Sequence, residues 1–376
     1  MNSNLRSALR SLGALRALPC IALGAALTAV ACSSPSATAR TPLANPATFA
    51  APAPNAGVQM KTEAFEVPPN TEVQNCYFFQ VSDLEAAAGM PTDQSLNVHR
   101  VEIVETAGSH HMNVFRVAGP ATMLDPTMGA VRNSNGQGQC FNSANWANWP
   151  LVANTQEAGD LDWSYPAGVA NELQPTEWLM LQVHYVNAST QQTPGGGQVA
   201  INFYTLPLAQ VTAELGTLFA TDQQIRICQS NPTPTFSQGC QIHSTAPVTI
   251  VGANGHFHSR GKQFDMFVWD GTSTTAPPNA SRFYQSNDWS EPPMEHSPGL
   301  EMPVPANGGV WYTCSYQWQP PPQSIGCAGL NTLDEAKGTP ADQTDCCYRF
   351  GGIVDENEHC NAFVYYYPKQ DNVTCE

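Results

Sequence analysis

Glycine and proline interrupt this chain at short intervals along most of its length. Its 376 residues include 28 glycines and 31 prolines, and both residue types end helices and form turns. Long helices are therefore not expected, and short strands separated by turns are favoured. Runs of β-branched, aromatic and alternating residues predict strands at Val98–Glu105, Met112–Val117, Trp178–Val186, Val199–Tyr204, Val248–Val251, Phe264–Trp269, Val310–Tyr316 and Ala362–Tyr367. We expect an all-β protein made of β-sandwiches or jelly rolls.

The charge of the chain restricts its partners. It has 15 Lys+Arg against 31 Asp+Glu, a formal net charge of -16 at pH 7. Binding of nucleic acid needs a basic surface that neutralises phosphates, so no nucleic-acid partner is expected. A hydrophobic content of 42% with 9% aromatic residues also argues against a disordered chain.

Residues 1–31 have the features of an export signal. Three arginines precede the apolar run Ala17–Ala31, which is short for a membrane-spanning helix. The run ends in small residues directly before Cys32, a pattern similar to a bacterial lipobox, in which the cysteine becomes the lipidated first residue. We predict an exported lipoprotein, periplasmic or on the surface of a bacterium, with Cys32 as its only membrane anchor. Ordinary cleavage after Ala31 is the alternative.

Residues 32–63 are rich in Ser, Ala, Pro and Thr and almost uncharged, which predicts a flexible tether. The folded part is then expected to start near Ala64. It has roughly 310 residues, enough for two domains. We place the boundary within Leu206–Thr217, which gives domains at 64–210 and 211–376.

The cysteines predict disulfides and not a thiolate metal site. Cys20 lies in the signal and Cys32 at the lipobox, and the remaining ten are an even number. In an exported protein this implies about five disulfides. The neighbours Cys346 and Cys347 are expected to bond to different partners, because a ring between them would be strained.

Histidines on predicted strands could bind a metal ion. In His256-Phe257-His258 the two imidazoles lie at i and i+2, and such residues share one face. His184 lies in the middle of a predicted strand, with Gln182 on the same face. Imidazoles without thiolate or carboxylate ligands suit Cu, Zn or Fe. A single strand histidine such as His184 can equally be a packed core residue.

The pair His110-His111 needs an irregular strand to act on one ion, because adjacent residues normally point to opposite faces. Gly108-Ser109, directly upstream, could provide that irregularity. The remaining isolated histidines are assigned structural roles; they are His99, His243 and His296.

Five motifs in chain order resemble the copper type II, ascorbate-dependent monooxygenases, the family of peptidylglycine α-hydroxylating monooxygenase and dopamine β-monooxygenase. The resemblance extends over nearly all of residues 64–376. The motifs are Ser109-His110-His111-Met112, Ser164-Tyr165-Pro166-Ala167-Gly168-Val169, Leu181-Gln182-Val183-His184-Tyr185, His256-Phe257-His258-Ser259-Arg260-Gly261-Lys262 and Glu358-His359-Cys360-Asn361.

This resemblance implies two jelly-roll-like β-sandwich domains with one copper each, which face one another across a solvent-filled cleft. It implies an electron-storing copper held by His110, His111 and His184, with Gln182 assigned to the same cofactor site. It also implies a second copper, held by His256 and His258, where O2 binds and a C–H bond is hydroxylated. The implied disulfides are Cys76–Cys140 and Cys314–Cys360.

The sequence departs from the family at the second copper. His359 occupies the position of a methionine ligand. An imidazole is harder than a thioether and tolerates Cu(II) better, so we expect His359 to ligate at a lower potential. The alternative is that His359 does not ligate and that oxygenase chemistry is lost.

Two further departures concern the substrate. Asn254 stands where the peptide hydroxylase has an arginine that holds the peptide carboxylate, and Phe363 stands where it has a tyrosine. Asn cannot form the bidentate ion pair that arginine forms with a carboxylate. A peptide with a C-terminal glycine is therefore not the expected substrate.

We accordingly expect an oxidoreductase, a monooxygenase with two copper ions per chain and His256, His258 and His359 at the catalytic centre. It would hydroxylate a small-molecule substrate with O2 and with ascorbate or another one-electron donor. The alternative is a non-catalytic copper-binding lipoprotein for sensing, storage or transfer, which the histidine at position 359 favours.

Overall fold

A computed structural model describes residues 45–118, 131–133, 149–156, 160–188, 195–332 and 345–375. Leu43–Glu376 form one compact unit. Strands make up most of the regular structure of the described residues, which confirms the all-β prediction, and each of the eight predicted strands overlaps one in the structure. The helices among them are α1 (Val81–Ala87), α2 (Gly326–Thr332) and the 3-10 turns η1 (Pro46–Thr48), η4 (Leu208–Gln210) and η5 (Asn279–Ser281). In this part of the chain, no helix has the length and apolar character needed to cross a membrane.

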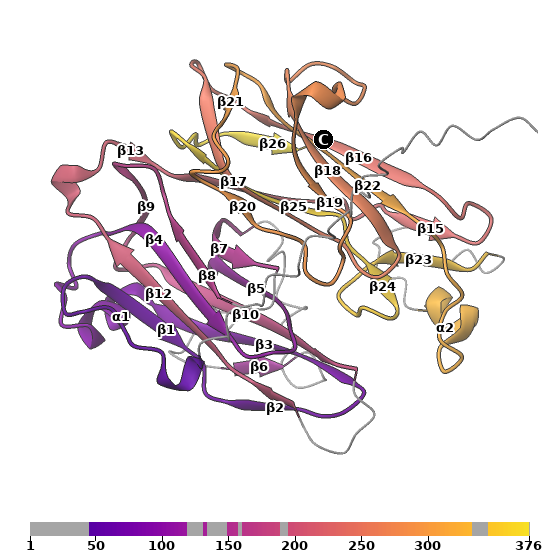
Figure 1. Cartoon of the computed structure of the whole chain (residues 1–376), viewed down its shortest axis with the longest axis horizontal. Helices are drawn as coiled ribbons and strands as arrows, with labels where there is room; N and C mark the ends of the chain where they lie inside the picture. The colour runs from indigo at the N-terminus through magenta and orange to yellow at the C-terminus, as the bar shows by residue number, and fades with distance from the viewer. Residues whose placement is uncertain are drawn as a thin grey trace, which may run out of the picture. The chain divides into compact units, whose positions relative to one another are not determined.

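The strands that precede Leu215 form two main sheets with a core between them (Figure 1). One sheet contains, in spatial order, β1 (Gly57–Lys61), β12 (Val199–Thr205), β4 (Leu96–Glu105), β9 (Val169–Leu173) and β13 (Ala213–Glu214), with β8 (Leu161–Ser164) beside β4. The other contains β6 (Val131–Asn133), β3 (Thr71–Gln80), β10 (Trp178–Asn187), β5 (Ser109–Arg116) and β7 (Leu151–Thr155). A ribbon adds β11 (Gly195–Gly197) and β2 (Phe65–Val67).

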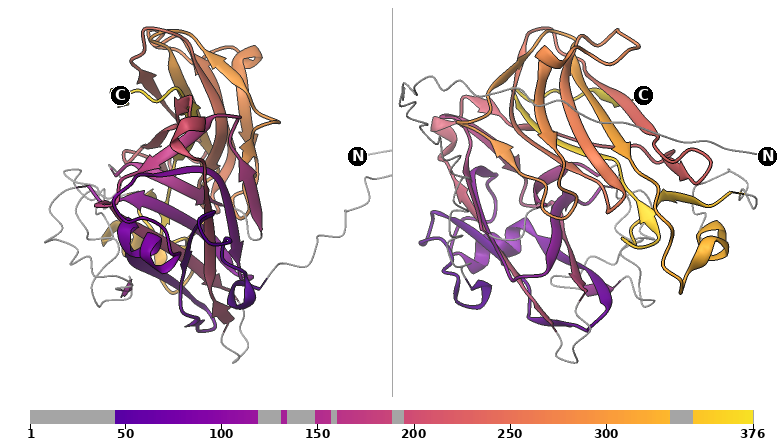
Figure 2. Two further views of the ribbon diagram at one scale, coloured as in Figure 1. Left: turned by 90° about the vertical axis from the view of Figure 1, so that its left-hand side faces the viewer. Right: turned by 45° about the vertical axis from the view of Figure 1, so that its right-hand side comes forward.

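The later strands form three sheets around a second core (Figure 2). The first contains β14 (Gly216–Thr221), β25 (Asn361–Tyr367), β17 (Val248–His256) and β20 (Glu295–His296), with β21 (Met302–Val304) beside β17. The second contains β19 (Arg282–Ser286), β18 (Gly261–Trp269), β22 (Gly309–Tyr316), β16 (Thr235–Ile242) and β26 (Val373–Cys375). The third contains β15 (Arg226–Cys228), β23 (Cys347–Phe350) and β24 (Asn357–Glu358).

The two cores meet at β25. Phe363 and Tyr365 pack into the first core, whereas Ala362, Val364 and Tyr366 pack into the second. Because successive strand residues point to opposite faces, both faces of β25 are covered by the protein. The predicted division near residue 210 stays a prediction, but the two halves share this buried strand.

The predicted tether is too long at its C-terminal end. Strand β1 pairs with β12, and Val58 and Met60 are fully buried in the first core. The alternation Val58-Gln59-Met60 is a strand pattern that the polar composition upstream obscured. The ordered chain therefore includes residues before Ala64.

Four disulfides lie among the described residues. Cys314–Cys360 is confirmed, and Cys346 and Cys347 bond to different partners, as expected. The four whose cysteines both lie in the described ranges are Cys228–Cys347, Cys240–Cys375, Cys314–Cys360 and Cys327–Cys346. Cys140, the predicted partner of Cys76, lies outside the described residues. This number of disulfides indicates an exported, non-cytoplasmic protein.

Candidate metal centre

The bulge that the His110-His111 pair requires is present in β5. Residue His111 lies opposite His184 of β10, but Tyr185 lies opposite Ser109, so His110 is an extra residue in β5. Gly108, with φ of 94°, adopts a left-handed conformation that other residues rarely take. The bulge places the rings of His110 and His111 with their centroids 5.3 Å apart.

His184 lies beside this pair. Its ring centroid is 5.1 Å from that of His110 and 4.9 Å from that of His111. Its Nε2 lies 2.7 Å from Oε2 of Glu72 on β3, and its Nδ1 is buried without a hydrogen-bond partner. A carboxylate on one ring nitrogen fixes the tautomer and leaves the other nitrogen free for a metal ion.

The second group of histidines lies at the end of one strand and in two connections, so the pair His256 and His258 does not lie within one strand as expected. His256 ends β17, His258 follows two residues later, and His359 lies between β24 and β25. The ring centroids of His258 and His359 are 4.5 Å apart, and both are 5.3 Å from that of His256. His258 Nδ1 lies 3.0 Å from the carbonyl oxygen of Asn357, so its Nε2, which is buried and unpartnered, is the nitrogen left for a ligand.

A buried ion pair holds this second group in place. Glu358 accepts hydrogen bonds from the backbone N–H groups of His258 and Arg260, at 2.8 and 2.9 Å. The Arg260 side chain donates its Nε–H to the same carboxylate at 2.7 Å and lies over the ring of Tyr348. On the other side of His359, the Cys314–Cys360 disulfide ties the chain to β22.

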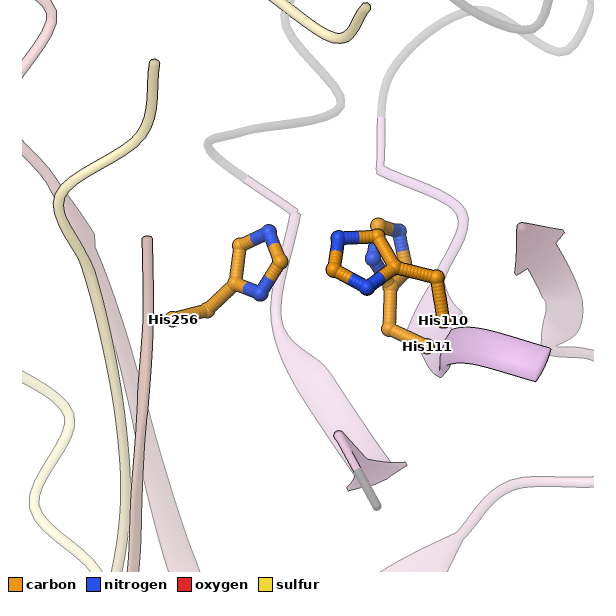
Figure 3. A group of neighbouring side chains, drawn as sticks. All are labelled: His110, His111 and His256. Carbon is orange, nitrogen blue, oxygen red and sulfur yellow. The ribbon is translucent and has the colours of Figure 1, made fainter. Parts of the chain in front are cut away.

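The structure brings all six candidate ligands into one cluster. His256 lies 5.0 Å from both His110 and His111, measured between ring centroids. Figure 3 shows these three rings pointing toward one another from the two halves of the chain. The resemblance implies a solvent-filled cleft between the two groups; here they are instead in contact. Strand β17, which ends at His256, pairs with β25, and Phe363 and Tyr365 of β25 pack into the first core.

Burial keeps the imidazoles of His110, His111, His256, His258 and His359 neutral. It lowers the pKa values of His110, His111, His256 and His258 well below their ordinary value, and neighbouring histidines add to the shift. Burial also lowers the pKa of His359 to about 3. Neutral imidazole is the form that binds metals.

Unpartnered nitrogens show that the cluster fits a metal. Each of the six histidines has at least one buried ring nitrogen without a hydrogen-bond partner. A buried polar atom normally has such a partner, and leaving it without one costs free energy. The nitrogens also lie close together. Those of His110, His111 and His256 are within 4.8 Å of one another, as are those of His256, His258 and His359. All-nitrogen donor sets of this kind suit copper or zinc.

A small cavity adjoins the cluster. It measures about 10 Å³, room for about one water molecule. His111, His256 and His359 line it together with the amide side chains of Gln74, Asn113, Gln156, Gln182 and Asn361. Gln182 accepts a hydrogen bond from Asn113 at 3.0 Å, and its own Nε2 is buried without a partner. The cavity therefore offers hydrogen bonds to a small polar molecule beside the histidines.

Asn254 is engaged within the protein. Its amide donates to the carbonyl oxygens of Pro292 and Pro293, both at 3.0 Å, and its side-chain oxygen accepts from Asn154.

The predicted catalytic and ligand roles of the histidines stay predictions, but the predicted residues do lie together.

The sequence analysis assigned Gln182 to the site but missed Glu72 and the amide side chains of Gln74, Asn113 and Gln156. Gln74 lies opposite His184, and Asn113 lies opposite Gln182, so these residues share one sheet face. Polar residues at alternate positions of otherwise apolar strands were the available signal. Only the strand pairing shows that they meet.

No protein-family model and no curated protein matches this chain. Among solved structures, PNGase F, a glycosylasparaginase from Flavobacterium meningosepticum, aligns over 85% of this chain and 99% of its own, at 9% identity and a TM-score of 0.28. The infectious bursal disease virus VP2 subviral particle aligns over 88% of this chain and 79% of its own, at 10% identity and a TM-score of 0.17. At such TM-scores the likeness carries no argument about fold or function.

Proposed function

We propose that this chain is an exported copper-dependent monooxygenase that hydroxylates a C–H bond of a small molecule. The observation that carries the proposal is the cluster of six buried histidines with unpartnered ring nitrogens. Bound copper would supply one-electron redox chemistry and O2 activation. The external reductant would be ascorbate or another one-electron donor, and Cys32 would carry the lipid anchor of a bacterial lipoprotein.

The protein's own residues prepare the site for this chemistry. Glu72 and the Asn357 carbonyl fix the tautomers of His184 and His258. The Arg260–Glu358 pair fixes the position of the second histidine group. The amide-lined cavity next to His256 and His359 provides hydrogen bonds for a molecule the size of water.

The second candidate is a non-catalytic copper-binding lipoprotein. One observation favours it: His359 joins the second group in place of a thioether, so that group consists of imidazoles. Such a set tolerates Cu(II) and weakens the preference for Cu(I). Sensing, storage or transfer of copper would then be the function.

One experiment separates the two. The protein is loaded with copper, dialysed and incubated with ascorbate, 18O2 and a panel of small amines, amides and aromatic compounds. Incorporation of one 18O atom into a compound, measured by mass spectrometry and lost in His258→Ala, supports the monooxygenase. Two coppers per chain without incorporation would favour the copper-binding protein. His243→Ala, outside the cluster, is the control variant.

A further inference from the structure

His256 lies between two pairs of histidines and belongs to both candidate metal groups. Its ligand atoms lie within 4.8 Å of those of His110 and His111, and also of those of His258 and His359. The distances between ring centroids are nearly equal on the two sides, 5.0 Å to the first pair and 5.3 Å to the second. Figure 3 shows His256 facing the first pair. One imidazole thus stands between two sets of donors.

Both ring nitrogens of His256 are unpartnered. The side chain is 2% exposed, and neither Nδ1 nor Nε2 has a hydrogen bond. Among the described histidines, no other has two such nitrogens. His184 and His258 each use one nitrogen on an oxygen of the protein, which leaves a single nitrogen for a metal. His256 has no such anchor, so both of its nitrogens are available.

We propose that His256 bridges two copper ions as an imidazolate. One nitrogen would join His110 and His111 on the first ion, and the other would join His258 and His359 on the second. His184, beside the first pair, can add a donor to the first ion. The bridge rests on the proposed copper chemistry but does not depend on oxygenase activity.

The proton balance of this bridge is simple. A neutral imidazole carries one N–H proton and one nitrogen lone pair, so it binds a single ion. Binding of the second ion replaces the remaining proton, which leaves as H⁺ to solvent. No electron is transferred. Release of this proton breaks no hydrogen bond of the described protein, because neither ring nitrogen of His256 has a hydrogen-bond partner.

The bridge has a spectroscopic signature that two separate sites lack. An imidazolate couples the unpaired electrons of two Cu(II) ions, so a bridged pair shows little of the EPR intensity expected for its copper content. The full-length chain is loaded with Cu(II) and dialysed. Copper is counted by elemental analysis, and the EPR signal is integrated at low temperature. We expect two coppers per chain with EPR intensity well below the bound copper.

Variants complete the test. His258→Ala removes a donor of the second ion only, so we expect one copper with full EPR intensity. His256→Ala should also restore intensity to match the copper retained, and His243→Ala should behave as wild type.

The bridge is overturned if the wild-type chain binds two coppers with full EPR intensity, or if it binds one copper only. The monooxygenase proposal would then still be tested by the 18O2 assay. A chain that binds no copper would overturn both. The wild-type measurement decides the question even where a variant fails to fold.

Discussion

At the scale of single residues, the candidate metal centre depends on the partners of its ring nitrogens. The Glu72 carboxylate lies 2.7 Å from His184 Nε2, and it orients a ring whose other nitrogen is buried and free. Such outer partners raise the basicity of the ligand and fix its orientation. Glu72 is therefore a positioning residue for metal binding.

Replacement of Glu72 should weaken copper binding without removing a ligand. We expect Glu72→Gln to lower copper affinity by about 10–100-fold, the usual effect of losing such a partner. Competition with a chromophoric chelator measures the affinity. Glu66→Gln, an exposed glutamate on β2, is the matched control. Equal affinity in wild type and Glu72→Gln would show that His184 is not a ligand.

The identity of residue 359 should set the redox preference of the second histidine group. We expect His359→Met to raise the reduction potential of the copper held there, because a thioether is softer and favours Cu(I). A redox titration followed by EPR measures the potential, with His243→Met as control. An unchanged potential would mean that His359 does not touch the metal.

At the scale of elements, the segment from His258 to Arg260 is clamped to β24 by a buried ion pair. Arg260 and Glu358 are 4% and 0% exposed. We expect Glu358→Gln to reduce the free energy of unfolding by about 3–5 kcal/mol, because the arginine stays buried without its counter-charge. Urea denaturation measures the loss.

A surface pair provides the comparison. Arg100 and Asp162 also form an ion pair, at 2.6 Å, but their side chains are 29% and 57% exposed. Asp162→Asn should therefore cost at most about 1 kcal/mol. Similar losses in Glu358→Gln and Asp162→Asn would contradict the proposed clamp.

The Cys314–Cys360 disulfide should act on the metal centre as well as on stability. It joins β22 to the residue directly after His359. We expect the double Cys→Ser variant to lower the free energy of unfolding by about 2–5 kcal/mol and also to weaken copper binding. The double variant of Cys240–Cys375, which joins β16 to β26, should lose stability alone. Equal copper affinity in both double variants would argue against the positioning role.

At the scale of the whole molecule, the two halves are held together through a strand buried on both faces. Phe363 and Tyr365 of β25 face the first core, and Tyr365 also donates a hydrogen bond to Asn154 of β7 at 2.6 Å. Trp163 of the first half donates to Ser297 of the second at 3.3 Å. The histidine cluster contains residues from both halves, so its geometry depends on these buried contacts between them.

The metal-free protein should lose stability in acid. The folded chain keeps His359 neutral to about pH 3, and it keeps His110, His111, His256 and His258 neutral well below pH 6.5. The unfolded chain takes up these protons near pH 6.5. Stabilisation is therefore complete above pH 6.5 and is lost as the pH falls from 6.5 toward 3. We expect the urea midpoint to stay level from pH 7.5 to about pH 6.5 and then to fall steadily toward pH 5.

Bound copper should raise the urea midpoint at low pH, because a bound ion stabilises the folded state.

In the metal-free protein, His359→Gln should make the urea midpoint depend less on pH. A midpoint that stays constant or rises toward pH 5 would contradict the assignment of buried, neutral histidines.

Much of the local structure could be predicted from the sequence. Strands such as β10 and β22 follow from β-branched and aromatic runs between turns. For the adjacent histidines His110 and His111, the sequence showed only that a shared ion requires a strand end or an irregularity, and the structure has a bulge there. The predicted tether extended into strand β1, because the Ser-, Ala- and Pro-rich composition of this region concealed the short strand pattern at Val58–Met60. Polar positioning residues such as Glu72 could not be predicted, since a carboxylate on an exposed strand end has the same sequence pattern as one that meets a histidine.

The all-β class, the closeness of His110 to His111 and of His256 to His258, and the disulfide-rich, export-type composition follow from the sequence, because they depend on local spacing and residue chemistry. The contact of His256 with His110 and His111 follows only from the folded arrangement of the strands. That contact joins residues about 145 positions apart, through strands whose order in the sheets no local pattern encodes. Burial of both faces of β25 brings them together, and it turns two predicted sites into one cluster.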